Sequence, residues 1–181
     1  MKIGILSGSV REGRKSTQVA QWVAQAAERR DGIEAELLEL ADFNLPLLTS
    51  AVIPAAANRQ YDSAEVSAWS KAIDACDGFV LVTPEYNHGV PGALKNAVDT
   101  LGPEWQNKSA ALVGYGADGG VRAIEQWRQV LANFNMHVVR STVALSVFTE
   151  FGESGLAPQE RRADEIAGLF DQLIESLSLR A

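Results

Sequence analysis

The stretch SGSVREGRKST, residues 7–17, places glycine, hydroxyl and basic residues between an apolar run and a helical pattern. Such residues at the start of a helix are suited to binding phosphate. The stretch comes close to the triphosphate-binding loop G-x-x-x-x-G-K-[S/T], because Gly8 and Gly13 have the required separation. Arg14, however, stands where the lysine of that motif should be, so the sequence raises the question of which phosphate this loop would hold.

Two familiar phosphate sites do not fit the sequence. A triphosphate site also needs an aspartate that holds magnesium, but the strand that should supply it ends in TPE, residues 83–85. The dinucleotide fingerprint G-x-G-x-x-G is absent, since Ser9 occupies its second glycine position, where the backbone must approach a pyrophosphate. These departures argue against an NTPase and against a dinucleotide-binding loop of this type.

A monophosphate needs hydroxyl groups, backbone N–H groups at a helix N-terminus and one or two cationic side chains. The stretch supplies these groups at the mouth of the first predicted helix, in Ser9, Arg11, Ser16, Thr17 and Gln18. The alternative is that Ser16 or Thr17 only caps that helix. We favour the phosphate interpretation, because the basic residues have no role in a cap.

Two further polar stretches follow predicted strands. The first, TPEYNHGVPGALKNAVD (residues 83–99), is a proline-rigidified turn of polar and aromatic residues before a helix that Pro91 can open. Such a turn offers fixed backbone donors and acceptors to a flat polar ring. The second stretch, GYGADGG (residues 114–120), is rich in glycine.

Hydrophobic periodicity predicts the elements that position these loops. Strands are predicted over residues 2–7, 33–40, 78–83, 110–116 and 138–145, and helices over 17–30, 62–76, 91–102 and 120–134. A final helix begins near Pro158 and carries apolar residues at helical spacing as far as Leu177. Asp62 followed by Glu65 predicts a capping box at the start of the 62–76 helix. Residues 41–61 have no steady period and are predicted to form a long loop that is functional or forms an interface.

Five strands alternating with five helices predict a doubly wound α/β fold with a parallel sheet. The common five-stranded order for such a fold is 2-1-3-4-5. Ligands bind such sheets at the carboxyl ends of the strands, near the switch point between strands 1 and 3. Residues 8–17, 84–90 and 116–120 are the loops at that edge, so their unusual composition and the topology point to one site.

Composition limits the other classes of function. The 181 residues fit a single domain, 1–181, and no apolar run approaches the ~20 residues that a membrane span needs. A net charge of −7 argues against nonspecific binding of nucleic acid or membranes. Cys76 is the only cysteine, so we expect it to pack in the interior and the protein to reside in the cytoplasm. No cluster of residues predicts a metal site.

Taken together, the 83–99 stretch and the GSxR motif after the first strand resemble the motifs of the NADPH-dependent FMN reductases. This flavodoxin-like family includes azo, quinone and chromate reductases, and the resemblance covers the chain in the order of its elements. It implies FMN as cofactor and a two-step cycle, in which NADPH or NADH delivers hydride to the flavin and an acceptor then takes the same stacking place. Quinone, azo, nitro, metal-oxyanion and flavin acceptors are all compatible with it. No protein nucleophile or obligatory general base is expected.

The resemblance also implies the positions of the flavin contacts. Ser9, Arg11, Ser16, Thr17 and Gln18 would hold the phosphate, although the serine comes later than in the usual GSxRxxS pattern, so that Ser16, Thr17 and Gln18 are all candidates. The isoalloxazine would be lined by Pro84, Glu85, Tyr86 and Asn87, largely through backbone groups, with His88 in the pocket wall and with Gly116 and Ala117 at the other edge.

Two other functions stay open at this point: a flavodoxin-type FMN electron carrier without substrate turnover, and a flavin-free binding protein of the same fold. The glycine-rich ring loops favour the reductase, because they leave the flavin open to nicotinamide. Residues 41–61 and the following helix predict a contact between subunits, so a homodimer or a dimer of dimers is expected.

Overall fold

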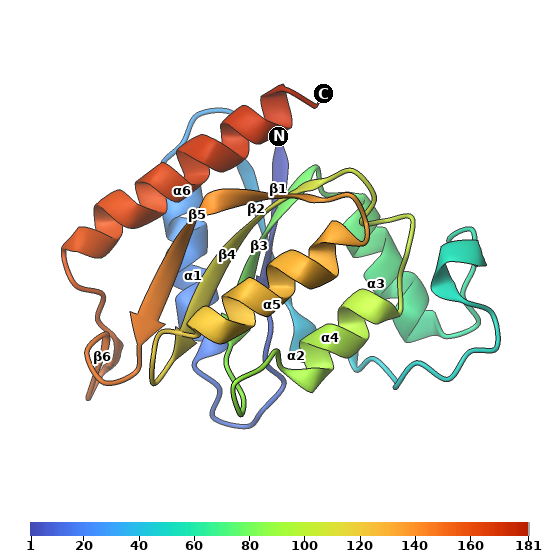
Figure 1. The fold of residues 1–181 in the computed structure, drawn as a ribbon, viewed down its shortest axis with the longest axis horizontal. Coiled ribbons are helices and arrows are strands. Elements are labelled where there is room, and N and C mark those ends of the chain that lie inside the picture. The colour runs from blue at the N-terminus through green and yellow to red at the C-terminus, as the bar shows by residue number, and fades with distance from the viewer. Residues whose placement is uncertain (181) are drawn as a thin grey trace.

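A parallel β-sheet forms the centre of the computed structural model, which describes residues 1–180 (Figure 1). Its strands are β1 (Lys2–Ser7), β2 (Glu34–Glu39), β3 (Gly78–Pro84), β4 (Ser109–Gly116) and β5 (His137–Ser146). Their order is β2-β1-β3-β4-β5, and every neighbouring pair is parallel. The predicted doubly wound α/β fold and its strand order are therefore confirmed.

Helices cover both faces of the sheet (Figure 1). The helices α1 (Ser16–Ala27) and α6 (Arg161–Ser178) pack on one face, and α3 (Ala64–Asp74), α4 (Gly92–Asp99) and α5 (Val121–Ala132) pack on the other. This arrangement follows from the alternation of side chains along each strand. In β3, for example, Val80 and Val82 face α1 and α6, whereas Phe79 and Leu81 face α3, α4 and α5. All residues of β3 are buried, as expected for a central strand.

The predicted loop over residues 41–61 needs a correction. Most of the segment is irregular, but it begins within the short helix α2 (Leu40–Phe43) and contains the 3₁₀ helix η1 (Pro54–Ala56). Elements of three or four residues are too short to show a hydrophobic period, which is why the sequence did not reveal them. In Figure 1 this segment arches away from α3 at the right of the view.

The N-cap of α3 is Ser63 and not the predicted Asp62. Ser63 Oγ accepts a hydrogen bond of 3.1 Å from Val66 N and donates one of 2.7 Å to Glu65 Oε2, which lowers the pKa of the Glu65 carboxyl. The helix ends at Asp74, two residues before the predicted end at Cys76. Serine and aspartate are similarly good caps, so composition alone did not choose between these neighbours.

This correction can be tested by mutation. We expect Ser63→Ala to lower the free energy of unfolding by about 1 kcal/mol, because Val66 N loses its partner. Asp62→Ala is the matched control and should change it by less than about 0.5 kcal/mol. Urea unfolding of both variants measures the difference. A larger loss in Asp62→Ala would restore the capping box predicted from the sequence.

A hairpin between β5 and α6 was not anticipated from the sequence. Its strands are β6 (Phe151–Gly152) and β7 (Gly155–Leu156), which pair antiparallel. The last helix then begins at Arg161, a few residues after the predicted start near Pro158. A strand of two residues is too short to show an alternation of apolar and polar residues, so the sequence did not reveal this hairpin.

Cys76 is buried, as predicted, in the core on the α3 side of the sheet. Burial raises the pKa of its thiol to about 11, with the neighbouring Glu36 carboxylate adding to the effect. The thiol therefore stays protonated near neutral pH, which suits a packing role.

Candidate functional site

The N-terminus of α1 lies at the carboxyl edge of the sheet, and no side chain caps it with a hydrogen bond. Lys15 is the N-cap residue, but no side chain there accepts a hydrogen bond, and the first turn contains no acidic residue. Val19 N donates to Lys15 O at 3.2 Å, whereas the three N–H groups before it have no partner among the described residues. These free N–H groups and the positive end of the helix dipole favour a bound anion.

Ser16 places a hydroxyl group in this open turn. Its side chain is fully buried, and Ser16 Oγ is the one buried side-chain polar atom of residues 1–180 without a hydrogen-bond partner. A buried polar group left unpaired costs about 1–3 kcal/mol, so this hydroxyl is a candidate contact for a bound group. Neither Ser16 nor Thr17 caps α1, so the capping alternative is not what the structure shows.

Ser9 joins the first loop to the loop after β3. It is buried, its Oγ lies 2.7 Å from the phenol oxygen of Tyr86, and the same Oγ accepts a hydrogen bond from Arg11 N at 3.3 Å. The structure therefore brings together the two loops that the sequence analysis singled out separately.

Tyr115 belongs to the same cluster, and sequence reasoning missed it. It is buried near the end of β4 and pairs with Pro84 in the register of β3 and β4. Burial raises the pKa of its phenol, and the hydroxyls of Ser16 and Ser9 lie close enough to the phenol to act in the opposite direction, although neither meets the geometry of a hydrogen bond to it. The alternation along β4 was a usable signal, because it points Tyr115 to the same face as Val113, toward α1.

The three cations of the REGRK segment have different surroundings. Arg14 Nε pairs with Glu39 Oε1 at 3.1 Å, and Lys15 Nζ lies 4.4 Å from the centroid of the Phe151 ring. Arg11 is exposed, and its side chain forms no hydrogen bond or ion pair within the described part of the chain. Arg11 is therefore the cation of this segment whose side chain has no contact of these kinds within the described part of the chain.

Thr17 and Gln18 both have partners inside the protein. Thr17 Oγ1 donates to Glu39 Oε2 at 2.7 Å, so its proton is committed to that carboxylate. Gln18 Oε1 accepts from Leu156 N at 2.9 Å, which leaves the Gln18 NH₂ group as a donor. The predicted contacts of these two side chains with a phosphate stay predictions, and Thr17 can contribute its backbone N–H in any case.

A tight turn presents backbone N–H groups after β3. Tyr86 N and Gly89 N each donate to the other residue's carbonyl oxygen at 3.0 Å, and both central residues, Asn87 (φ 50°) and His88 (φ 64°), are left-handed. This geometry is that of a type I′ turn. The N–H groups of Asn87 and His88 have no partner among residues 1–180 and are available at the tip.

Two side chains of α5 hold this turn in place. Arg122 donates to Glu85 through its backbone N at 3.0 Å and through Nη1 at 2.7 Å. Gln126 Oε1 accepts from Val90 N at 3.1 Å, and Gln126 Nε2 donates to His88 O at 3.0 Å. The Glu85 carboxylate is thus turned toward α5, which leaves backbone groups as the contribution of this loop to a ligand. Sequence reasoning had no local signal for Arg122 or Gln126.

The glycine-rich loop after β4 lies against the β3 loop. A Cβ atom on Gly116 would lie 3.5 Å from Glu85 Cβ, so the two loops are in contact. Gly119 has φ +75°, and a Cβ there would lie 2.9 Å from Ala144 Cβ, which explains the need for glycine. Ser146 Oγ donates to Ala117 O at 2.9 Å and holds the loop at the edge of the sheet.

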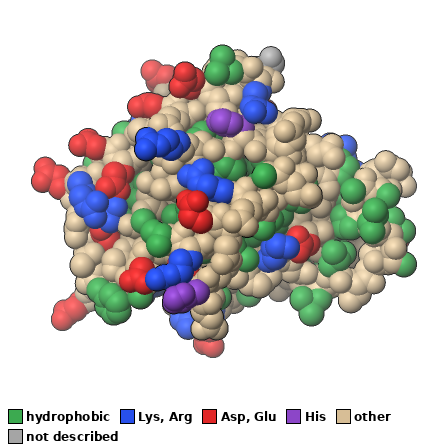
Figure 2. Space-filling view, viewed as in Figure 1, with side chains coloured by type: hydrophobic (Ala, Val, Ile, Leu, Met, Phe, Trp, Pro, Cys, Tyr) green, Lys and Arg blue, Asp and Glu red, His purple; other side chains and the backbone are tan. Residues whose placement is uncertain are grey.

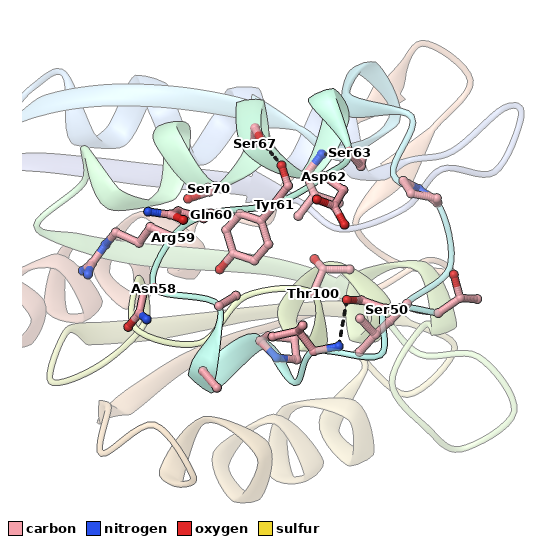
Figure 3. A pocket seen from close by; sticks show the side chains of 18 of the residues that line it. Ser50, Asn58, Arg59, Gln60, Tyr61, Asp62, Ser63, Ser67, Ser70 and Thr100 are labelled. Carbon is pink, nitrogen blue, oxygen red and sulfur yellow. Dashed lines mark hydrogen bonds between the residues drawn. The ribbon is translucent and has the colours of Figure 1, made fainter.

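A cavity of about 900 Å³ lies elsewhere, between α3 and residues 46–63 (Figure 3). None of the twelve predicted site residues lines it. Figure 3 shows hydroxyl groups turned into this space, but Tyr61 and Ser70 donate to the buried carboxylate of Glu104 at 2.8 and 2.7 Å. These hydroxyls are therefore satisfied by the protein, unlike that of Ser16.

Among residues 1–180 no group of three or more histidine, cysteine, aspartate or glutamate side chains is placed to hold a metal ion. In the same residues no helix is both long enough and apolar enough to cross a bilayer.

Comparisons with known proteins gave matches in both sequence and structure. The family model for NADPH-dependent FMN reductase matches residues 1–150. The chain is 35% identical over 187 residues to the NAD(P)H-dependent FMN reductase ntnL of Nectria sp, covering 97% of this chain and 93% of that protein. It is 32% identical to an NADPH azoreductase of Bacillus sp. strain OY1-2, over 86% of this chain and 83% of that protein. The solved structure of FerB, a flavoenzyme NAD(P)H:(acceptor) oxidoreductase from Paracoccus denitrificans, has the same fold, with a TM-score of 0.77 at 20% identity over 99% of this chain and 98% of that one.

Proposed function

The chain belongs to the NADPH-dependent FMN reductase family, and on that premise we propose that it transfers hydride from NAD(P)H through bound FMN to a small-molecule acceptor in two successive steps. FMN, when bound, supplies the redox chemistry, because its ring takes up a hydride and gives it to the next substrate. The residues of this chain bind the cofactor, orient it and leave one ring face open to both substrates.

The observation that carries the proposal is the buried, unpaired hydroxyl of Ser16 in the uncapped first turn of α1. A bound acceptor would satisfy it, and the adjacent free N–H groups and the unpaired cation of Arg11 favour an anionic acceptor. A phosphate monoester satisfies all three. Ser9, Arg11 and Ser16 are proposed as side-chain contacts, and Thr17 and Gln18 as contacts through the first turn of the helix.

Backbone groups are proposed to bind the ring. The free N–H groups of Asn87 and His88 would donate to its polar edge, with Pro84, Glu85 and Tyr86 lining the same side and Gly116 and Ala117 at the other edge. Donors fixed in this way stabilise the negative charge that the ring gains on reduction. No side chain is proposed to act as nucleophile or general base. The acceptor is proposed to be a quinone, azo, nitro, metal-oxyanion or flavin compound.

The test is the visible spectrum of the purified protein with added FMN, followed under anaerobic conditions after NADPH is added. The expected result is bound flavin whose absorbance bleaches at once. Bound flavin that stays oxidised would indicate an electron carrier instead. A protein that binds no flavin would contradict the proposal and favour a flavin-free binding protein of this fold.

We also propose that two copies associate through residues 46–53. Four large apolar side chains are exposed there, Leu47, Leu48, Val52 and Ile53, with 77% and 67% of the surface of Leu47 and Ile53 accessible. Figure 2 shows hydrophobic side chains gathered over this segment at the right of the view. A cytoplasmic location is proposed as well, with the single cysteine as its support.

The double variant Leu47→Asp, Ile53→Asp tests the association. We expect the wild type to sediment as a dimer or a dimer of dimers and the variant as a monomer, since each aspartate would carry charge into an apolar contact. Leu179→Asp is the matched control. Leu179 is similarly exposed, but it is the C-cap residue of α6 and does not belong to residues 46–53. A wild type that sediments as a monomer at micromolar concentration would contradict the proposal.

A further inference from the structure

The β6–β7 hairpin contacts the first turn of α1 at two points. Lys15 Nζ lies 4.4 Å from the centroid of the Phe151 ring, a cation–π contact. Leu156 N donates to Gln18 Oε1 at 2.9 Å. Lys15 and Gln18 stand on either side of Ser16 and Thr17, so the hairpin holds both ends of the turn that carries the unpaired hydroxyl. The hairpin lies just beyond the residues that match the family model, which end at 150.

Gly155 allows the hairpin to approach Gln18. Its φ is +111°, and a Cβ atom at this position would lie 2.6 Å from Gln18 Oε1. Any side chain at residue 155 would therefore displace the amide or the strand. Because Leu156 N–H can only donate, it turns the amide oxygen of Gln18 toward the hairpin and leaves the NH₂ group as a donor.

Glu150 anchors the base of the hairpin. This residue is fully buried, and its carbonyl oxygen accepts from Ala157 N at 2.8 Å, which closes the hairpin. Its carboxylate accepts from Gln159 N at 2.8 Å and pairs with Arg162 Nη2 at 2.7 Å. The hairpin is thus tied to α6, which itself packs on the sheet beside α1 (Figure 1).

We propose that the β6–β7 hairpin is a positioning element that sets the first turn of α1 for the phosphate group of the cofactor. The inference rests on the proposed function and deepens it. A cradle of unpaired donors binds tightly only if it is held in its binding conformation beforehand, since ordering on binding costs affinity. Phe151, Gly155 and Glu150 act through Lys15 and Gln18 and touch no substrate themselves.

Phe151→Leu and Gly155→Ala test this role, each with FMN and with riboflavin, which lacks the phosphate. Dissociation constants measured by flavin fluorescence should rise about threefold to tenfold for FMN in each variant, as expected from the loss of one cation–π or hydrogen-bond contact. Riboflavin affinity should be unchanged. Gly152→Ala is the matched control, because a Cβ at Gly152 meets no atom within 4 Å.

The outcomes separate this inference from the function on which it rests. Unchanged FMN affinity in both variants would overturn the positioning role, and so would an equal loss of FMN and riboflavin affinity, which would indicate a general structural effect. A wild type that binds neither flavin would contradict the proposed function and the inference with it. If Gly155→Ala does not fold, Phe151→Leu decides alone, because leucine keeps the apolar contact and removes only the ring.

Discussion

Replacing Arg162 with leucine is expected to lower the free energy of unfolding by about 3–5 kcal/mol, because it leaves the carboxylate of Glu150 buried without its cation. Glu150 is 0% exposed and the Arg162 side chain 6%. Burial acts to lower the pKa of Arg162, but the hydrogen bonds that its guanidinium donates to Glu150 and Glu165 outweigh this effect, so the pKa is raised and Arg162 stays charged. Urea unfolding of the variant and the wild type measures the loss.

Arg161→Leu is the matched control for this experiment. Arg161 is the neighbouring residue, it is 59% exposed, and it pairs with Glu165 at the surface. We expect its replacement to cost less than about 1 kcal/mol, as is usual for an exposed ion pair. The double variant Glu150→Leu, Arg162→Leu should regain most of the stability lost by Arg162→Leu, since it leaves no unpaired charge. Equal losses in Arg161→Leu and Arg162→Leu would contradict the role given to burial.

Arg11→Ala is expected to weaken FMN binding by about 1.5–3 kcal/mol, which corresponds to roughly 10- to 150-fold in the dissociation constant. The reason is that Arg11 is the one cation of the REGRK segment whose side chain has no partner among residues 1–180, so it is free to form a charge-assisted bond to phosphate. Fluorescence titration with FMN measures the change. Riboflavin affinity should stay the same, because riboflavin has no phosphate.

Arg29→Ala provides the charge-matched control for Arg11→Ala. Arg29 is exposed beyond the far end of α1, so its removal changes the net charge equally without touching the first turn. FMN affinity should be nearly unchanged in this variant. If Arg11→Ala also leaves FMN affinity unchanged, the phosphate lies somewhere other than the first turn of α1.

Much of this fold follows from patterns that are local in the sequence. The continuous apolar run of β3 and the helical spacing in α1 and α6 show the elements, because strands and helices bury side chains at different periods. Topology rules then place the carboxyl ends of β1, β3 and β4 at one edge. The polar loops at that edge were therefore predictable as a candidate site, and their motifs indicated the family.

The choice between neighbouring residues was not predictable in the same way. Ser63 caps α3 in place of Asp62, although both are good caps, because the backbone of α3 begins one residue later than expected. The short elements α2, η1 and β6–β7 were missed for a related reason: none is long enough to show a period.

The sequence by itself determined which loops form the candidate site and which residue types they bring to it. Only the tertiary structure decided which of those residues are free to bind. Arg14 forms an ion pair with Glu39, and Lys15 forms a cation–π contact with Phe151. The side chain of Arg11 and the hydroxyl of Ser16, in contrast, have no hydrogen-bond partner among residues 1–180. Glu39 and Phe151 lie 25 and 136 residues away from their partners in the chain. The physical reason is that a side chain's free hydrogen-bonding capacity depends on neighbours brought close by the packing of distant elements, which no local pattern encodes.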